Sequence, residues 1–192
     1  MPIERDTVIV VDIESTCWEK KQIPPNQRSE IIEIGICTYE IATGKIDNRR
    51  GILVKPIESE VSQYCTDLTH ITIDMLTSEG ISFESACEVL REEYKSGNRL
   101  WLSWGNYDRR MFMEQCQRRN IDYPFTDNHC NLKGLFANIY GNRLGMKAAL
   151  DKIKLDLQGT HHRGVDDAHN IARILHFMLE THGIDLLDSF WD

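Results

Sequence analysis

The sequence lacks the features that mark several large protein classes. Among its 192 residues, no apolar run approaches the ~18–20 residues that cross a bilayer, so we expect no membrane segment. The N-terminus has neither the basic nor the apolar stretch of a signal peptide, which predicts a cytoplasmic protein. Glycine-rich phosphate loops and catalytic triads built on serine or cysteine are also missing.

Cysteine is present but is not arranged for cross-links or for zinc. The six cysteines are scattered without a C-x-x-C spacing, which favours buried free thiols over a disulfide framework or a zinc knuckle. They are Cys17, Cys37, Cys65, Cys87, Cys116 and Cys130.

Positive charge is also scarce, because 22 Lys and Arg residues face 30 Asp and Glu residues and give a net charge of −8. Broad binding of duplex nucleic acid depends on many contacts between basic side chains and phosphates, so this balance argues against it. It does not exclude an enzyme that holds one strand end through metal ions, since bound cations would invert the sign of an acidic site.

The length and the 41% content of apolar residues predict one globular domain over residues 1–192. β-Branched and apolar runs predict strands at 7–12, 31–39, 46–54 and 100–103, the first buried on both faces. Apolar residues at helical spacing predict helices at 83–94, 109–118, 132–140, 146–153 and 165–179. This order predicts an α/β fold with a mixed sheet flanked by helices.

Acidic side chains stand at the ends of two predicted strands. Asp12 and Glu14 are two residues apart, so a strand points both carboxylates to the same face. Asp108 follows the strand at 100–103. Taken alone, Asp12 and Glu14 are typical of a charged strand end that faces solvent. Taken alone, Asp108 is typical of a helix N-cap. Their shared place at the edge where α/β sheets bind ligands instead indicates a site.

A histidine and a further acid enter the last predicted helix. His162 precedes Asp167 by five residues, a plausible pair for activating water beside a metal. The alternative is a surface histidine tract followed by a helix-capping acid. Four carboxylates from three distant segments match the oxygen ligands that two divalent ions require, and they make zinc less suitable.

Three motifs resemble those of the DEDDh (DnaQ-like) exonuclease superfamily: VVDIEST, NYDRRMF and HHRGVDDAHN. The segments SEIIEIG, YCTDLTHIT, NLKGLF and GMKAAL resemble more narrowly the branch of histone-mRNA 3′-end exonucleases, their RNAi-related relatives and bacterial KapD-type proteins. The resemblance implies an RNase H-like fold with a five-stranded mixed sheet. It also implies 3′→5′ hydrolysis of single-stranded ends to nucleoside 5′-monophosphates.

By this resemblance Asp12, Glu14, Asp108 and Asp167 would hold two Mg²⁺ or Mn²⁺ ions, and His162 would be the general base. His162 is favoured over His161 because it has the H-x-x-x-x-D register ending at the acid before Ala168. The expected partner is nucleic acid with a single-stranded 3′ end, RNA being favoured over DNA. The sequence does not indicate a protein partner.

Residues near the motifs are candidates for binding the terminal nucleotide, because bases stack on aromatic or apolar surfaces. The candidate set is Ser15, Thr16, Trp18, His70, Trp104 and Tyr107. Core packing is the alternative for the aromatic members, and a loop substitution is the alternative for His70, where relatives often have glycine. Basic residues that could steer the backbone, or simply form a solvated surface, are Lys20, Lys21, Arg28, Arg109 and Arg163.

Two other functions compete with the exonuclease hypothesis. A binding module that kept the fold and lost activity would usually have lost one of the acids, and all four are present. An endonuclease of the RNase H type would use similar metals but cut inside a hybrid, and the His162 motif favours the exonuclease.

Overall fold

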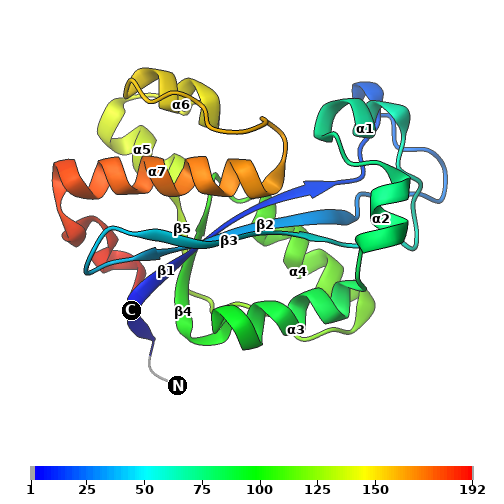
Figure 1. Ribbon diagram of the computed structural model, residues 1–192, viewed down its shortest axis with the longest axis horizontal. Coiled ribbons are helices and arrows are strands. Elements are labelled where there is room, and N and C mark those ends of the chain that lie inside the picture. Colours follow the sequence, from blue (N-terminus) through cyan, green and yellow to red (C-terminus); the bar gives the residue numbers. More distant parts are fainter. Residues whose placement is uncertain (1–2, 192) are drawn as a thin grey trace.

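The computed structural model describes residues 3–191, which form a five-stranded mixed sheet with helices on both faces (Figure 1). The strands are β1 (Glu4–Ser15), β2 (Ile31–Glu40), β3 (Ile46–Leu53), β4 (Arg99–Ser103) and β5 (His129–Asn131). The α-helices are α1 (Gln63–Thr69), α2 (Ile73–Glu79), α3 (Phe83–Tyr94), α4 (Tyr107–Arg119), α5 (Leu132–Tyr140), α6 (Met146–Lys152) and α7 (Gly164–His182). Short 3₁₀ segments are η1 (Glu19–Lys21), η2 (Ser96–Asn98) and η3 (Ile184–Phe190).

The strand order is β3-β2-β1-β4-β5, so β1 is central, as its β-branched sequence predicted. It pairs antiparallel with β2 and parallel with β4, and β5 continues the sheet parallel to β4. The carboxyl ends of β1, β4 and β5 therefore meet at one edge of the sheet. The four strands and five helices expected from the residue pattern are confirmed, and so is the five-stranded mixed sheet expected from the resemblance.

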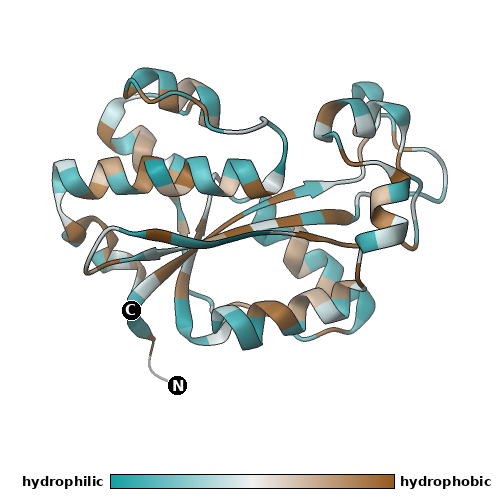
Figure 2. Ribbon diagram, in the orientation of Figure 1, coloured by the Kyte–Doolittle hydropathy of each residue, from teal (hydrophilic) through white to brown (hydrophobic). Residues whose placement is uncertain are grey.

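Alternate residues of β1 pack into two separate cores, which explains why this strand is apolar throughout. Val8 and Val10 face the layer of α5, α6 and α7, whereas Ile9 and Val11 face α3 and α4. All four side chains are fully buried. Figure 2 shows hydrophobic residues along the strands, while the helices alternate between hydrophobic and hydrophilic positions.

Three elements have no counterpart in the residue pattern. β5 has only three residues, too few to show a period, and α1 and α2 have seven residues each. Ser62 and Thr72 cap these two helices through their side chains, by accepting hydrogen bonds from the backbone N–H groups of Cys65 and Met75. Within residues 3–191 no helix combines the length and the apolar character needed to cross a bilayer.

Candidate functional site

Three carboxylates meet at the carboxyl end of β1. Asp12 and Glu14 project from the same face of this strand, and Asp167 comes from the first turns of α7. One oxygen of each lies within 4.8 Å of the other two. Asp12 and Glu14 are partly buried, and Asp167 is only 5% exposed. The predicted pair on β1 is thus joined by an acid that is more than 150 positions away in the sequence.

The start of α7 is fixed against the sheet by two glycines. Gly35, opposite Asp12 on β2, leaves no room for a side chain, because a Cβ there would lie 1.8 Å from the carbonyl carbon of Gly164. A Cβ on Gly164 would lie 3.0 Å from the backbone oxygen of Asp12. Backbone therefore packs on backbone here, and this contact sets the distance from Asp167 to the carboxylates of β1.

A buried ion pair reinforces the same junction. Glu33 is fully buried on β2 and lies opposite Glu14 in the sheet. Its carboxylate accepts hydrogen bonds from Arg163 Nε and Nη2, both at 3.2 Å, and from the backbone N–H of Gly164 at 2.8 Å. These bonds hold Arg163 and Gly164, at the start of α7, against β2.

Asp108, the fourth predicted acid, lies at the first turn of α4 and is 4% exposed. Its Oδ1 accepts a hydrogen bond from the backbone N–H of Ile13 at 3.0 Å, between Asp12 and Glu14. This bond anchors α4 to the end of β1. Asp108 therefore borders the carboxylate cluster from the side of β4.

The crowding of acids raises the pKa values of the cluster. Burial, and then the neighbouring carboxylates, raise the pKa of Asp12 well above its usual range and that of Glu14 to about 9. Burial raises the pKa of Asp108 to about 6, although its bond from Ile13 acts in the opposite direction. Burial also raises the pKa of Asp167, against the hydrogen bond from the N–H of His162.

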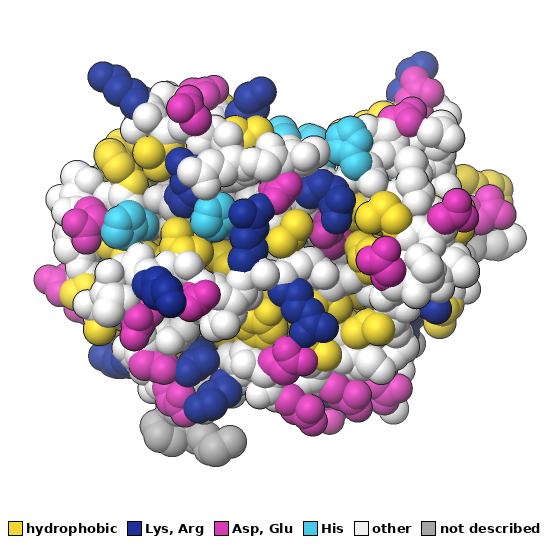
Figure 3. Space-filling view, viewed as in Figure 1, with side chains coloured by type: hydrophobic (Ala, Val, Ile, Leu, Met, Phe, Trp, Pro, Cys, Tyr) yellow, Lys and Arg dark blue, Asp and Glu magenta, His cyan; other side chains and the backbone are white. Residues whose placement is uncertain are grey.

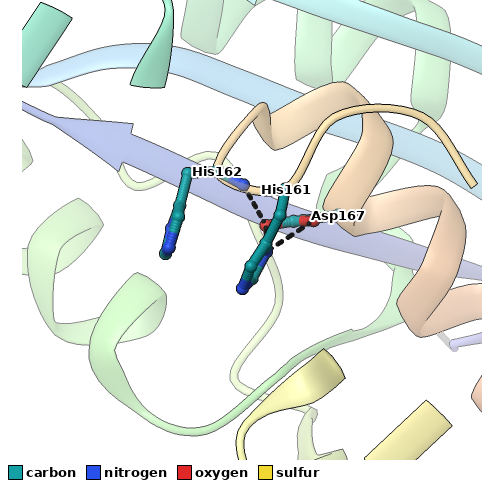
Figure 4. A group of neighbouring side chains, drawn as sticks. All are labelled: His161, His162 and Asp167. Atoms are coloured by element: carbon teal, nitrogen blue, oxygen red, sulfur yellow. Dashed lines mark hydrogen bonds and ion pairs between the residues drawn. The ribbon is translucent and has the colours of Figure 1, made fainter. Parts of the chain in front are cut away.

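Two histidines lie above Asp167, with their rings stacked at a centroid distance of 4.0 Å (Figure 4). Nδ1 of His161 is 3.0 Å from Oδ2 of Asp167, and the backbone N–H of His162 donates to the same oxygen at 3.0 Å. The ring of His162 makes no hydrogen bond to any residue between 3 and 191. Burial, and then the neighbouring histidines, lower the pKa of His162.

Of the candidate nucleotide-binding residues, Ser15 and Tyr107 lie together beside the carboxylates. The Ser15 hydroxyl is 2.8 Å from the Tyr107 hydroxyl, and the Tyr107 side chain is 43% exposed. Thr16 is fully buried, and its hydroxyl donates to the carbonyl of Arg28 and accepts from the N–H of Glu30. The structure thus places Thr16 in the loop scaffold and Tyr107 at the surface.

The other three candidates come from three separate loops of the chain. Trp18 precedes η1 and is partly exposed. His70 ends α1 in the left-handed conformation, with φ of 59°, which explains why glycine is suited to this position. Trp104 donates through Nε1 to the carbonyl of Leu144 at 3.1 Å and packs edge-on against Phe136, so part of its ring belongs to the core.

In the space-filling view the molecule is hollowed between helix α1 and the layer of α6 and α7, and histidine side chains border this hollow (Figure 3). Basic and acidic side chains are interspersed over the rest of this face. His161 and His162 are partly exposed rather than enclosed in the core.

Glu33 and the two glycines, Gly35 and Gly164, are parts of the site that the sequence did not predict. The available signal was an acid in the otherwise apolar strand sequence IIEIGIC, since a buried charge needs a partner. That partner is Arg163, which the sequence offered as a residue that steers the nucleic-acid backbone or as part of a solvated surface, and which instead pairs with Glu33.

The residues present fit divalent cations. The charged neighbours that raise the pKa of Asp12 are all acids, namely Asp108, Glu14, Asp167 and Glu33. A buried cluster of like charges is unfavourable unless cations or protons neutralise it. Carboxylate oxygens are the ligands that Mg²⁺ and Mn²⁺ prefer.

Comparison with known proteins gives concordant matches. The chain matches the exonuclease (RNase T) family over residues 9–175. Snipper, a 3′-5′ exonuclease of Drosophila melanogaster, is 30% identical over 88% of this chain and 67% of its own length. Human 3′-5′ exoribonuclease 1 is 30% identical over 91% of this chain, which spans only 53% of that protein. The crystal structure of the nuclease domain of 3′hExo, a DEDDh family member bound to rAMP, superposes with a TM-score of 0.83 at 27% identity, covering 95% of this chain and 96% of that domain.

Proposed function

Because the chain belongs to the exonuclease family, as its three motifs predicted, we propose that it is a metal-dependent 3′→5′ exonuclease acting on single-stranded ends. The observation that carries the proposal is the cluster of Asp12, Glu14 and Asp167, with oxygens within 4.8 Å, next to two stacked histidines. RNA is favoured over DNA, since similar proteins include an exoribonuclease and a nuclease domain bound to rAMP. The chain would act as one catalytic domain.

Asp12, Glu14 and Asp167 are the residues that would hold two Mg²⁺ or Mn²⁺ ions, with Asp108 completing the set from α4. Bound divalent ions would supply an activated water and neutralise charge on the phosphate during in-line displacement. The backbone hydrogen bond from Ile13 keeps Asp108 at this edge, and the glycine contact keeps Asp167 there. The chain's own contribution is therefore a fixed arrangement of acids, made before any substrate binds.

His162 is the proposed general base. Its lowered pKa keeps the imidazole neutral near pH 7, so a ring nitrogen is able to take the proton of the attacking water. Its ring is not used in a hydrogen bond to a described residue, whereas His161 is engaged by Asp167. The water oxygen bonds to phosphorus, the 3′-oxygen of the preceding nucleotide leaves, and a nucleoside 5′-monophosphate is released.

The free thiols support the expected cytoplasmic setting, because the six described cysteines form no disulfide.

The exposed ring of Tyr107, beside Ser15, is the strongest candidate surface for stacking the terminal base.

The test is a time course on 5′-labelled single-stranded RNA, single-stranded DNA and duplex, with Mn²⁺ and with EDTA. The expected result is a ladder that shortens by one nucleotide at a time with Mn²⁺ and is absent with EDTA. Asp12→Asn serves as the inactive control, because it removes a charge from the cluster with little change in shape. Internal fragments at early times would indicate an endonuclease, and binding without cleavage by the unaltered chain would indicate a binding module.

A further inference from the structure

A second pocket lies beside the carboxylate cluster, at the same edge of the sheet. It has a volume of about 330 Å³, at the small end of the ~300–1,000 Å³ typical of ligand pockets. We call it the β5 pocket, because β5 and the start of α5 form one wall and the loop from β4 to α4 forms the other. Its side-chain lining comprises Trp104, Asn106, Tyr107, Asn131, Lys133 and Arg143.

The topology places this pocket close to the cluster of Asp12, Glu14 and Asp167. β1, β4 and β5 are neighbours and run parallel, so their carboxyl ends stand side by side. Val10, Leu102 and Cys130 are in register on these three strands, and neighbouring strands lie ~4.8 Å apart, so Cys130 is about 10 Å from Val10, two residues before Asp12. Tyr107 joins the two sites, since it lines the pocket while its hydroxyl contacts Ser15, the residue after Glu14.

The charge of the pocket is opposite to that of the cluster. Lys133 and Arg143 line it, and neither side chain forms an ion pair or a hydrogen bond with any residue from 3 to 191. Most arginines elsewhere are paired, among them Arg28 with Glu58, Arg99 with Asp6 and Arg119 with Glu30. In a chain of net charge −8, two cations left together without a counter-ion indicate a site for an anion.

A larger hollow of about 410 Å³ beside α4 lacks this excess of positive charge. Its single basic side chain, Arg109, is accompanied in the lining by Asp122 and Asp127. The lining of the β5 pocket contains no acid. A phosphate group would therefore be favoured in the β5 pocket and disfavoured in the larger hollow.

We propose that the β5 pocket binds the phosphodiester next upstream of the scissile one, through Lys133 and Arg143, and so holds the incoming single strand in register. The inference rests on the proposed exonuclease function. Tyr107 then stands between the two nucleotides at the cut, and Trp104 offers a further ring to the upstream base. The acidic cluster holds the scissile phosphate through cations, whereas this pocket holds its neighbour directly.

The test compares a strand with a substrate that is too short to reach the pocket. Kinetics are measured on a labelled 12-nucleotide RNA and on the p-nitrophenyl ester of thymidine 5′-monophosphate. Each phosphate contact to a single strand contributes a slope of ~0.7 to the salt dependence, which equals about fivefold in affinity at 0.1 M salt. Because both side chains bind one phosphodiester, Lys133→Ala with Arg143→Ala should raise KM for the RNA about fivefold and reduce the salt slope by about 0.7. Hydrolysis of the ester should be unchanged.

Lys133→Arg should keep most of the affinity, because it keeps the charge. The matched control is Lys45→Ala, which removes one charge from the turn between β2 and β3, at the opposite edge of the sheet. An unchanged KM for the RNA in the double variant, or an equal rise in Lys45→Ala, would overturn the proposal. If the unaltered chain cleaved neither substrate, the exonuclease proposal would fail, and anisotropy of the same RNA with Ca²⁺ would still measure the pocket.

Discussion

Gly35→Ala is the substitution that most directly tests how the site is assembled. The added Cβ would lie 1.8 Å from the carbonyl carbon of Gly164, whereas carbon atoms in contact are normally ~3.5–4.0 Å apart. Both partners are backbone, so no side chain is able to turn away. The start of α7 must then move from β2 by roughly 2 Å, which is the difference between the two separations.

This displacement has two consequences of known scale. Overpacking costs about 1–3 kcal/mol, and a contact between two backbones belongs at the upper end. For a chain of this size, ~3 kcal/mol lowers the Tm by roughly 6–12 °C. Asp167 moves with the helix, away from oxygens that lie within 4.8 Å, and a misplacement of ~1 Å is able to lower a rate about 100-fold.

The assay combines thermal unfolding, Mn²⁺ titration and exonuclease rate, all measured well below the Tm of the variant. Gly164→Ala should give a smaller loss, because its Cβ would be 3.0 Å from the nearest atom and a shift of a few tenths of an ångström relieves it. Gly97→Ala is the matched control, since it is exposed with nothing within 4 Å, and it should change neither stability nor rate. A Gly35→Ala protein with normal Mn²⁺ affinity and rate would refute this account of the site.

Two further predictions concern protons. His162→Ala should lower kcat about 100-fold or more at pH 7, and His161→Ala should lower it less; equal losses, or a larger one for His161→Ala, would contradict the assignment of the base. In EDTA the carboxyl group of Glu14 has a pKa of about 9 in the folded state and about 4.5 in the unfolded state, so between these pH values only the folded state keeps its proton. The Tm in EDTA should therefore fall as the pH rises from 5 to 9, and Mn²⁺ should abolish this fall; a flat profile in EDTA would argue against the crowding of the acids.

The sheet and its long helices could be predicted because each carries a complete local signal. The β-branched run of β1 at 7–12 is too short for a helix and suits a buried strand, and α7 shows its apolar stripe from Val165 to Leu179. β5 was not predictable, since His129–Asn131 completes the sheet through its pairing with β4 rather than through a pattern of its own. The resemblance supplied this strand where the residue pattern did not.

The residues of the site also fall into those that the sequence predicts and those that it does not. Asp12 and Glu14 could be placed on one face from strand geometry alone, and their meeting with Asp167 followed once the motifs were combined. The roles of Glu33 and Gly35 depend on which residue of α7 crosses β2, and no spacing in the sequence records that crossing. The unpaired state of Lys133 was equally hidden, because a lysine in a sequence does not show whether an acid lies beside it.

These hidden contacts explain how the chain tolerates its own acids. Asp12, Glu14 and Asp167 repel one another, and helix α7 would relieve that repulsion by moving away from the sheet. The ion pair of Glu33 with Arg163 opposes this movement, since it holds the first turn of α7 from a fully buried position on β2. The glycine contact lets the helix come close, and the ion pair keeps it there. The acids are thus held in a geometry that only bound cations or protons make favourable, so the affinity for cations follows from how tightly α7 is fixed to β2.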